Sequence, residues 1–180
     1  MRINRIDTIA VVIDVQQRLY PYIHDNHKLT DKLVRLVKGL RVLGIEIIVT
    51  EQYSKGLGNT IPEVQEALGK YNHLEKTSYS CCGLIDFNTI LKNSGKNNVI
   101  IAGIESHVCV LQTVTDLCAK GYLPFVIEDC VSSRNPNDKK IAIERMRKEG
   151  AIISTYESIL FELMDISGTD EFKAISKIVK

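Results

Sequence analysis

Residues 99–113 read VIIAGIESHVCVLQT, and this stretch decides the fold. An apolar run ends at Gly103, Cys109 follows six residues later, and apolar residues then recur at helical spacing. A continuous apolar run is typical of a strand that is buried on both faces of a parallel sheet. The stretch therefore predicts a strand, a sharp turn at Gly103, and a helix whose first turn carries Cys109.

The rest of the chain repeats this alternation of apolar runs and amphipathic segments. Strands are predicted over residues 8–14, 45–50, 73–78, 97–103, 123–129 and 151–155. Helices are predicted over residues 27–44, 60–69, 86–95, 104–120 and 135–150, followed by two short helical segments. Strands that alternate with helices predict an α/β fold, here a parallel sheet with helices on both faces in three α/β/α layers.

Length and composition favour one globular domain over residues 1–180, with 44% hydrophobic residues. The net charge of +1 gives no electrostatic case for binding nucleic acid or a membrane. The apolar run near the start is flanked by Asp7 and Asp14, so we expect a first strand and not a signal peptide. The five cysteines show no metal-type spacing and no disulfide framework is expected, which predicts a cytoplasmic location.

Three reactive side chains follow predicted strand ends. Asp14 ends the first strand, Lys76 lies at the third, and Cys109 follows the turn after the fourth. Ligands of open α/β sheets bind beyond the carboxyl ends of the strands, so these three side chains are expected at one edge. A helix start and a nearby lysine favour a thiolate, and a carboxylate can carry its proton. The sequence therefore predicts a nucleophilic cysteine with its own acid–base group.

Each cysteine and histidine also has a structural interpretation. Cysteine is commonly a small buried apolar residue, and we keep that interpretation for Cys118 and Cys130. Cys81 and Cys82 lie near Lys76 in sequence, so a pocket role stays open for them. His107 precedes Cys109 by two residues, and side chains two apart on a helix diverge, so a Cys–His pair is not expected. Asp14 could equally cap a loop, and Lys76 could form a solvated charge pair.

Three segments, VVIDVQQRL, LEKTSYSCC and IIAGIESHVCVLQTVTDL, together resemble the isochorismatase-like cysteine hydrolases in order and in placement at strand ends. The resemblance covers nearly the whole chain and implies a six-stranded, Rossmann-like parallel sheet in the order 3-2-1-4-5-6. It implies a catalytic triad in which Cys109 is the nucleophile, Asp14 carries the proton, and Lys76 stabilises the thiolate and orients Asp14. It also implies a cis peptide bond between Ile104 and Glu105, with the amides of Glu105 and Cys109 forming an oxyanion hole.

The segment TEQYSKGLG after the second strand resembles a subgroup of uncharacterised hydrolases that includes octameric bacterial proteins. It lacks the Asp-x-His metal motif of the family's nicotinamidases, so neither a metal nor another cofactor is expected. Substrate-binding residues are predicted at Gln16, Tyr20, Gln52 and Tyr53. The resemblance also implies a homo-oligomer, with dimer, tetramer and octamer all open, and a small-molecule substrate.

Three functions stay open from the sequence. The first is hydrolysis of a small amide, carbamoyl or related acyl C–N substrate through a covalent thioester on Cys109. The second is isochorismatase-type hydrolysis of a vinyl ether, which uses Asp14 as the acid and forms no covalent intermediate. The third is a non-catalytic assembly protein that retains the hydrolase scaffold.

Overall fold

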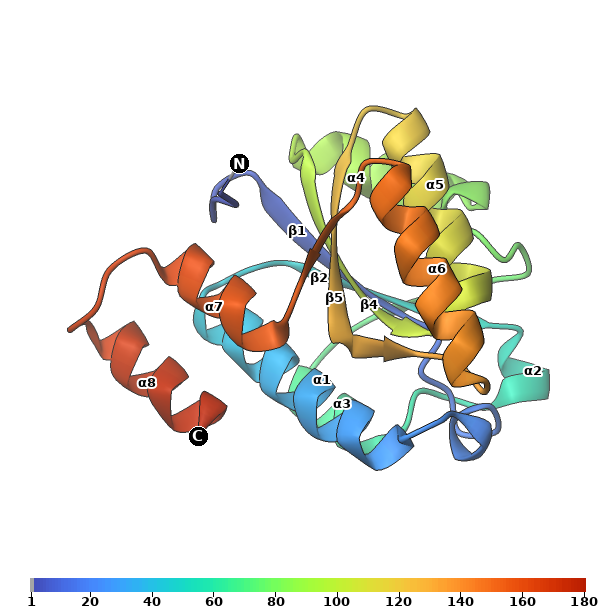
Figure 1. The fold of residues 1–180 in the computed structure, drawn as a ribbon, viewed down its shortest axis with the longest axis horizontal. Coiled ribbons are helices and arrows are strands. Elements are labelled where there is room, and N and C mark those ends of the chain that lie inside the picture. The colour runs from blue at the N-terminus through green and yellow to red at the C-terminus, as the bar shows by residue number, and fades with distance from the viewer. Residues whose placement is uncertain (1) are drawn as a thin grey trace.

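Parallel strands in the order β3-β2-β1-β4-β5-β6 form the central sheet of six (Figure 1). The structure, a computed structural model, describes residues 2–180. The strands are β1 (Thr8–Ile13), β2 (Ile47–Gln52), β3 (His73–Lys76), β4 (Asn98–Ile104), β5 (Leu123–Ser132) and β6 (Ile152–Ser154). The predicted fold class and strand order are thus confirmed.

Helices cover both faces of this sheet. They are α1 (Asn26–Val42), α2 (Ser54–Leu57), α3 (Pro62–Leu68), α4 (Ile85–Ser94), α5 (Leu111–Ala119), α6 (Pro136–Lys148), α7 (Tyr156–Met164) and α8 (Asp170–Val179). Short 3₁₀ turns lie at Tyr20–Tyr22 and Cys81–Gly83, and a π-helical turn at Ser106–Val110 precedes α5. Helices α1, α3, α7 and α8 pack on one face, and α4, α5 and α6 pack on the other. No helix within residues 2–180 is long and apolar enough to span a membrane.

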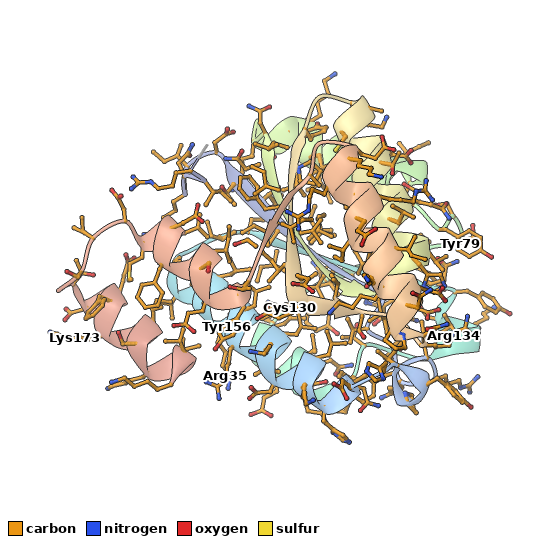
Figure 2. The ribbon with its side chains drawn as sticks, viewed as in Figure 1. Arg35, Tyr79, Cys130, Arg134, Tyr156 and Lys173 are labelled. Atoms are coloured by element: carbon orange, nitrogen blue, oxygen red, sulfur yellow. The ribbon has the colours of Figure 1, made fainter. Side chains whose placement is uncertain are left out.

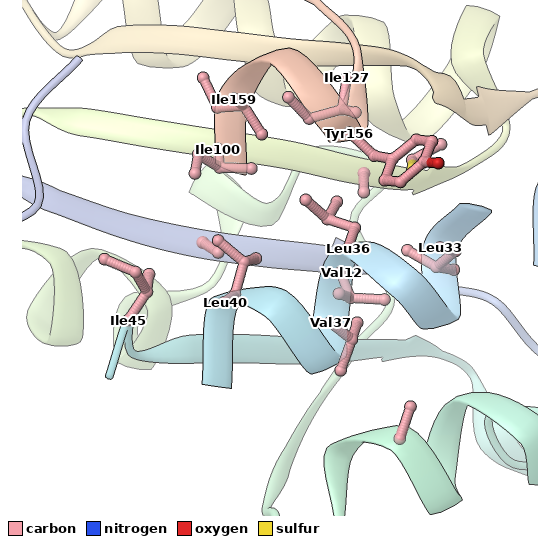
Figure 3. Close-up of a cluster of buried hydrophobic side chains, with 14 of the residues drawn as sticks. Val12, Leu33, Leu36, Val37, Leu40, Ile45, Ile100, Ile127, Tyr156 and Ile159 are labelled. Carbon is pink, nitrogen blue, oxygen red and sulfur yellow. The ribbon is translucent and has the colours of Figure 1, made fainter. Parts of the chain in front are cut away.

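The alternating side chains of β1 divide the core into two clusters. Val12 packs with α1 and its neighbours, whereas Val11 packs with the α4, α5 and α6 side. Figure 3 shows the first cluster, where Leu36 and Leu40 of α1 lie against the sheet. Every residue of β1 is buried, as a central parallel strand requires. This burial fixes the position of β1, so the residue that follows it leaves the sheet at a defined place.

The fifth strand is longer than the sequence predicts. The strand is predicted over residues 123–129, whose last two are Glu128 and Asp129, but β5 continues to Ser132. Pairing with β4 breaks after Ile101 and resumes with Gly103 opposite Val131, so the acidic pair lies in a β-bulge. A bulge leaves residues unpaired within a strand and bends it, which explains the misplaced end.

Gly103 lies where β4 passes closest to β1. Its φ is 119°, and a Cβ atom built there would overlap the backbone carbonyl of Ile13. Because the obstacle is backbone of a central strand, no side-chain movement relieves the overlap. Only glycine fits at this point of the sheet.

We predict that Gly103→Ala lowers the free energy of unfolding by more than about 3 kcal/mol or prevents folding. Gly95→Ala is the matched control, because Gly95 also has a positive φ of 65° but a Cβ added there would meet nothing within 4 Å. The control is expected to lose about 1 kcal/mol, from backbone conformation alone. Urea unfolding of both variants measures the difference, and equal losses would contradict a role for the contact with Ile13.

Candidate active site

The predicted triad residues leave the sheet at its carboxyl edge. Asp14 follows β1 with a positive φ of 51°, and Lys76 is the last residue of β3. Cys109 lies in the π-helical turn that follows β4, which the sequence predicted as the first turn of an ordinary helix. Cα pairing places Ile13 beside both Thr50 and Gly103, so β1, β2 and β4 end together. The topology therefore brings three distant segments to one place.

Lys76 and Asp14 form a buried ion pair. The distance between Lys76 Nζ and Asp14 Oδ2 is 2.6 Å, and the two side chains are 0% and 1% exposed. Lys76 Nζ also donates to Gln52 Oε1 at 2.7 Å and to the carbonyl oxygens of Ser78 and Tyr79 at 3.2 and 3.0 Å. Burial lowers the pKa of Lys76, but the Asp14 carboxylate outweighs burial and leaves this pKa raised. Lys76 is therefore held as a cation with no freedom to turn away.

The second oxygen of Asp14 is bound by a residue that sequence reasoning missed. Thr50 Oγ1 donates to Asp14 Oδ1 at 2.7 Å, and Thr50 is fully buried. Asp14 thus accepts one hydrogen bond on each oxygen, from Thr50 and from Lys76. The position of Thr50 could have indicated this contact, because Thr50 lies near the end of β2, at the same edge of the sheet as Asp14. These two donors fix the orientation of the carboxylate.

Cys109 is 7% exposed, and the charges of Asp14 and Lys76 both act on its thiol. Burial raises the pKa of Cys109 strongly, and the charge of Asp14 raises it further, while Lys76 lowers it. This differs from the stabilised thiolate that the sequence predicted. The physical reason is that the charge of Lys76 is already paired with Asp14, so the nearest uncompensated influence on the thiol is desolvation. The raised pKa of Cys109 favours the protonated thiol in the resting site.

Cys81 borders the same cluster without an evident chemical role. Its Sγ lies 3.9 Å from Thr50 Oγ1, and its backbone N–H donates to Thr113 Oγ1 at 3.0 Å. Burial raises the pKa of Cys81 to about 11, so it is a neutral filler between the two threonines. Burial likewise raises the pKa of Cys82 to about 12.

His107 faces away from Cys109. Its Nδ1 lies 2.9 Å from Ser133 Oγ, and its Nε2 lies 3.9 Å from a carboxylate oxygen of Asp138. His107 therefore does not pair with Cys109, as the sequence predicted, and instead joins the segment that carries Cys109 to the loop after β5.

The four predicted substrate-binding residues divide into two kinds. Gln16 is fully buried, and its side-chain amide bonds the backbone of Gln52 and Gly58, so it ties two loops together. Tyr20 packs on the hydrophobic core and its hydroxyl contacts Thr30 Oγ1 at 2.8 Å. The polar side-chain atoms of both residues are thus occupied by contacts within the protein, and their role in substrate binding stays a prediction. Tyr53 is 54% exposed, and Gln52 touches Lys76 directly, so only these two border the cluster.

The turn before Cys109 is closely tied to its surroundings. The peptide bond between Ile104 and Glu105 is cis. The Glu105 carbonyl accepts the backbone N–H groups of Val108 and Val110 at 3.1 and 3.2 Å. Ser106 Oγ is buried and has no hydrogen-bond partner within residues 2–180. The Glu105 carboxylate is bound by Arg134, a contact that sequence reasoning did not find.

The described part of the chain contains no group of three or more histidine, cysteine, aspartate and glutamate side chains placed to hold a metal ion. A hollow of about 550 Å³ lies elsewhere, between α1 and α6, and its lining includes Lys32, Asp129 and Lys139 but no triad residue. Both positively and negatively charged side chains line this hollow, and none of its lining residues is a cysteine. We therefore place the candidate active site by chemistry, at Asp14, Lys76 and Cys109.

A parallel sheet with a thiol, a carboxylate and an ammonium group at its carboxyl edge defines a Rossmann-like protein of the hydrolase type. The model of the isochorismatase domain matches residues 8–158, and the chain belongs to the isochorismatase family. It is 36% identical to isochorismatase domain-containing protein 1 of Salmo salar over 173 residues, which cover 96% of this chain and 61% of that protein. The chain thus spans less than two thirds of that relative.

Two solved structures are similar over nearly the whole chain. A Caenorhabditis elegans protein described as MAR1 ribonuclease superimposes with a TM-score of 0.93 and 37% identity, over 99% of this chain and 92% of that one. The Escherichia coli YcaC gene product, described as an octameric hydrolase of unknown specificity, superimposes with a TM-score of 0.92 and 22% identity, over 99% and 89%. The similarity to YcaC, at 22% identity, is a similarity of fold.

The neutral thiol of Cys109 generates a prediction about alkylation. Raising a thiol pKa lowers the thiolate fraction, so direct thiolate attack contributes little between about pH 6 and about pH 9. We expect iodoacetamide to modify Cys109 through proton transfer to Asp14, at a rate that changes less than about threefold over this range. Asp14→Asn should slow the reaction about 100-fold. Peptide mass spectrometry reads each cysteine separately.

Cys118 is the internal control for this profile. It is partly exposed, so its alkylation should rise about tenfold per pH unit, as for an ordinary thiol below its pKa. A parallel tenfold rise at Cys109 would show that a free thiolate reacts there and that Asp14 takes no proton.

Proposed function

We propose that this protein is a metal-independent cysteine hydrolase that cleaves a small amide, carbamoyl or related acyl C–N substrate. The observation that carries the proposal is the buried Cys109 thiol, on which the charge of Asp14 acts, together with the Asp14 carboxylate held by Lys76 at 2.6 Å. A nucleophile, a proton carrier and a group that orients the carrier are the minimum for covalent acyl transfer.

The first half of the proposed reaction forms a thioester. Cys109 Sγ attacks the substrate carbonyl carbon while its proton passes to Asp14. The backbone amides of Glu105 and Cys109 hold the developing oxyanion. Asp14 then gives the proton to the leaving nitrogen, the C–N bond breaks, and an amine or ammonia departs. Lys76 stays charged throughout and keeps the Asp14 oxygen aimed at the thiol.

The second half returns the enzyme to its resting state. Water attacks the thioester carbonyl and gives a proton to Asp14, and the C–S bond breaks to release the acid. The proton on Asp14 returns to Cys109 Sγ. A resting thiol with a raised pKa suits this cycle, because the proton needed by the leaving nitrogen is stored in the site. One cycle consumes one substrate molecule and one water molecule and no other reactant.

We predict that Cys109→Ala lowers kcat/KM by at least about 1,000-fold on any authentic substrate. A panel of primary amides, carbamoyl compounds and activated acyl esters, read by ammonia release and intact mass, should show a covalent acyl adduct on the wild-type protein. Cys118→Ala is the matched control and should keep full activity, because Cys118 lies on α5 outside the site. Turnover that survives Cys109→Ala would exclude the covalent mechanism.

The vinyl ether alternative gives a different pattern with the same variants. Isochorismate hydrolysis that survives Cys109→Ser, is lost in Asp14→Asn and shows no mass adduct would assign Asp14 as a general acid without a nucleophile. A Cys109 that stays inert to every thiol reagent in the folded protein would favour the assembly protein on a hydrolase scaffold.

The ribonuclease name of the nematode relative makes RNA a second candidate substrate. The chain has a net charge of +1, and the charges at the triad are paired, so the site offers little attraction to a polyanion. RNA cleavage that is unchanged by Cys109→Ala and steeply salt-dependent would replace our proposal.

We also infer that the chain works as a cytoplasmic homo-oligomer. The description of YcaC as octameric supports assembly, and so do exposed apolar side chains such as Ile85, which is 79% exposed. Light scattering is expected to give a mass of at least twice 20.2 kDa. A mass of one chain at micromolar concentration would contradict this inference.

A further inference from the structure

Thr113 lies on α5, four residues after Cys109, and its side chain is fully buried. Its Oγ1 accepts the backbone N–H of Cys81 at 3.0 Å and donates to the Cys109 carbonyl oxygen at 2.7 Å. A backbone N–H can only donate, so the hydroxyl accepts from Cys81 and its single hydrogen is left for Cys109. Both partners are main-chain groups, so Thr113 joins the backbones of two separate segments.

The first of these segments is the π-helical turn that carries Cys109. Within it, the backbone N–H of Val110 donates to the Glu105 carbonyl oxygen at 3.2 Å, a bond that spans five residues as π geometry requires. The α-helical geometry of α5 begins at Leu111. A threonine hydroxyl that bonds the carbonyl group four residues earlier bends a helix locally. The bond from Thr113 to Cys109 therefore falls at the change from π to α geometry and holds the turn there.

The second segment is the loop of residues 77–82, which follows β3 and holds Lys76. Lys76 Nζ donates to the carbonyl oxygens of Ser78 and Tyr79 in this loop at 3.2 and 3.0 Å. Figure 2 shows Tyr79 on the opposite side of the molecule from α8. The N–H group that Thr113 accepts belongs to the same loop. The loop therefore contacts the ammonium group of the triad and, through Thr113, the backbone of the nucleophile.

A second side chain of α5 binds this loop. Ser80 Oγ donates to Asp116 Oδ2 at 2.6 Å and accepts the backbone N–H of Cys82 at 3.2 Å. Asp116 lies three residues after Thr113, and residues at this spacing are neighbours on the surface of a helix. The loop is thus bonded to α5 at two successive residues, and α5 connects it to the turn that carries Cys109.

We propose that Thr113 is a positioning residue, whose hydroxyl sets the separation between the Cys109 turn and the loop that holds Lys76. This inference rests on the proposed function of Cys109. Lys76 fixes the Asp14 carboxylate at 2.6 Å, so the loop determines where the proton carrier lies and the turn determines where the thiol lies. A small misplacement of reacting groups slows a reaction strongly, so the bridge acts on the rate and not only on folding.

The experiment follows alkylation of Cys109 by iodoacetamide in Thr113→Val, which replaces the hydroxyl with a methyl group. We expect the rate at about pH 7 to fall about tenfold, because the thiol is no longer held in place for proton transfer to Asp14. We expect it to rise more than about tenfold from about pH 6 to about pH 9, because the thiolate path remains. Hydrogen exchange at the Cys81 amide, which loses its acceptor, should accelerate at least about tenfold.

The conservative variant assigns these effects to the hydroxyl. Thr113→Ser keeps the hydroxyl, so its rate at Cys109 should stay within about twofold of wild type, with the nearly pH-independent profile expected of wild type. Thr113→Ala is a second variant without the hydroxyl, and it serves if the valine variant does not fold, because alanine favours a helix. Thermal unfolding identifies the temperatures at which each variant is folded, and all rates are measured below them.

Thr89→Val is the matched control. Thr89 Oγ1 also donates to a carbonyl oxygen four residues earlier, that of Ile85 at 2.9 Å, but it lies on α4 outside the site. This variant should leave the rate and the pH profile of Cys109 unchanged. Cys118 lies on α5 with Thr113, and an unchanged rate there in Thr113→Val would show that the helix itself has not loosened.

The possible failures are distinguishable. A Thr113 variant that lacks the hydroxyl and keeps the wild-type rate and profile overturns the positioning role and leaves the cysteine hydrolase standing. A Thr113→Ser variant as slow as Thr113→Val, or equal slowing in Thr89→Val, would show that the bridge is not the cause and would overturn it as well. A wild-type Cys109 whose rate rises about tenfold per pH unit excludes Asp14 as the base, which overturns the proposed mechanism and this inference together.

Discussion

The buried contact between Lys76 and Asp14 is the constraint on which the site depends. Two opposite charges that are both withdrawn from water are costly unless their geometry is close and their remaining hydrogen-bonding groups are satisfied. Here the separation is 2.6 Å, and Gln52, Thr50 and two carbonyl groups supply the remaining partners. The pair is therefore stable only when β1, β2 and β3 end in register. Folding of the sheet and assembly of the proton carrier are the same event.

The nucleophile is attached to this pair through a different constraint, the close packing of β4 on β1. Gly103 allows the backbones to approach, and the chain then turns at once into the π-helical segment that carries Cys109. A π-helical turn is rare and is often found at functional positions, because it places one residue differently from an α-helix. Thr113 Oγ1 accepts from the Cys81 amide and donates to the Cys109 carbonyl, so the turn is also tied to the segment after β3 on the same face of the sheet.

Much of this could be predicted from the sequence, because it depends on local patterns. The apolar runs predicted the parallel sheet, and the polar residues after the strands predicted three reactive side chains at one edge. The strand order followed from the resemblance to the isochorismatase-like hydrolases. Contacts between side chains of distant segments could not be predicted. Gln16 is predicted to bind substrate, yet its amide is bonded to the backbone of Gln52 and Gly58. Arg134 was missed because nothing in its own segment signals the carboxylate that it binds, whereas the position of Thr50 near the end of β2 could have indicated its contact with Asp14.

The protonation of Cys109 shows why proximity to a lysine is not sufficient to predict a thiolate. An ammonium group stabilises an anion only with the part of its field that a nearer anion has not cancelled, and Asp14 lies 2.6 Å from Lys76. The thiol therefore experiences a nearly neutral pair and a desolvated environment, and both favour the S–H form. In the mechanism that we propose, the Asp14 carboxylate, fixed by Thr50 and Lys76, accepts the thiol proton when a carbonyl carbon arrives. In that mechanism, the same pair that disfavours the resting thiolate also supplies the base for attack.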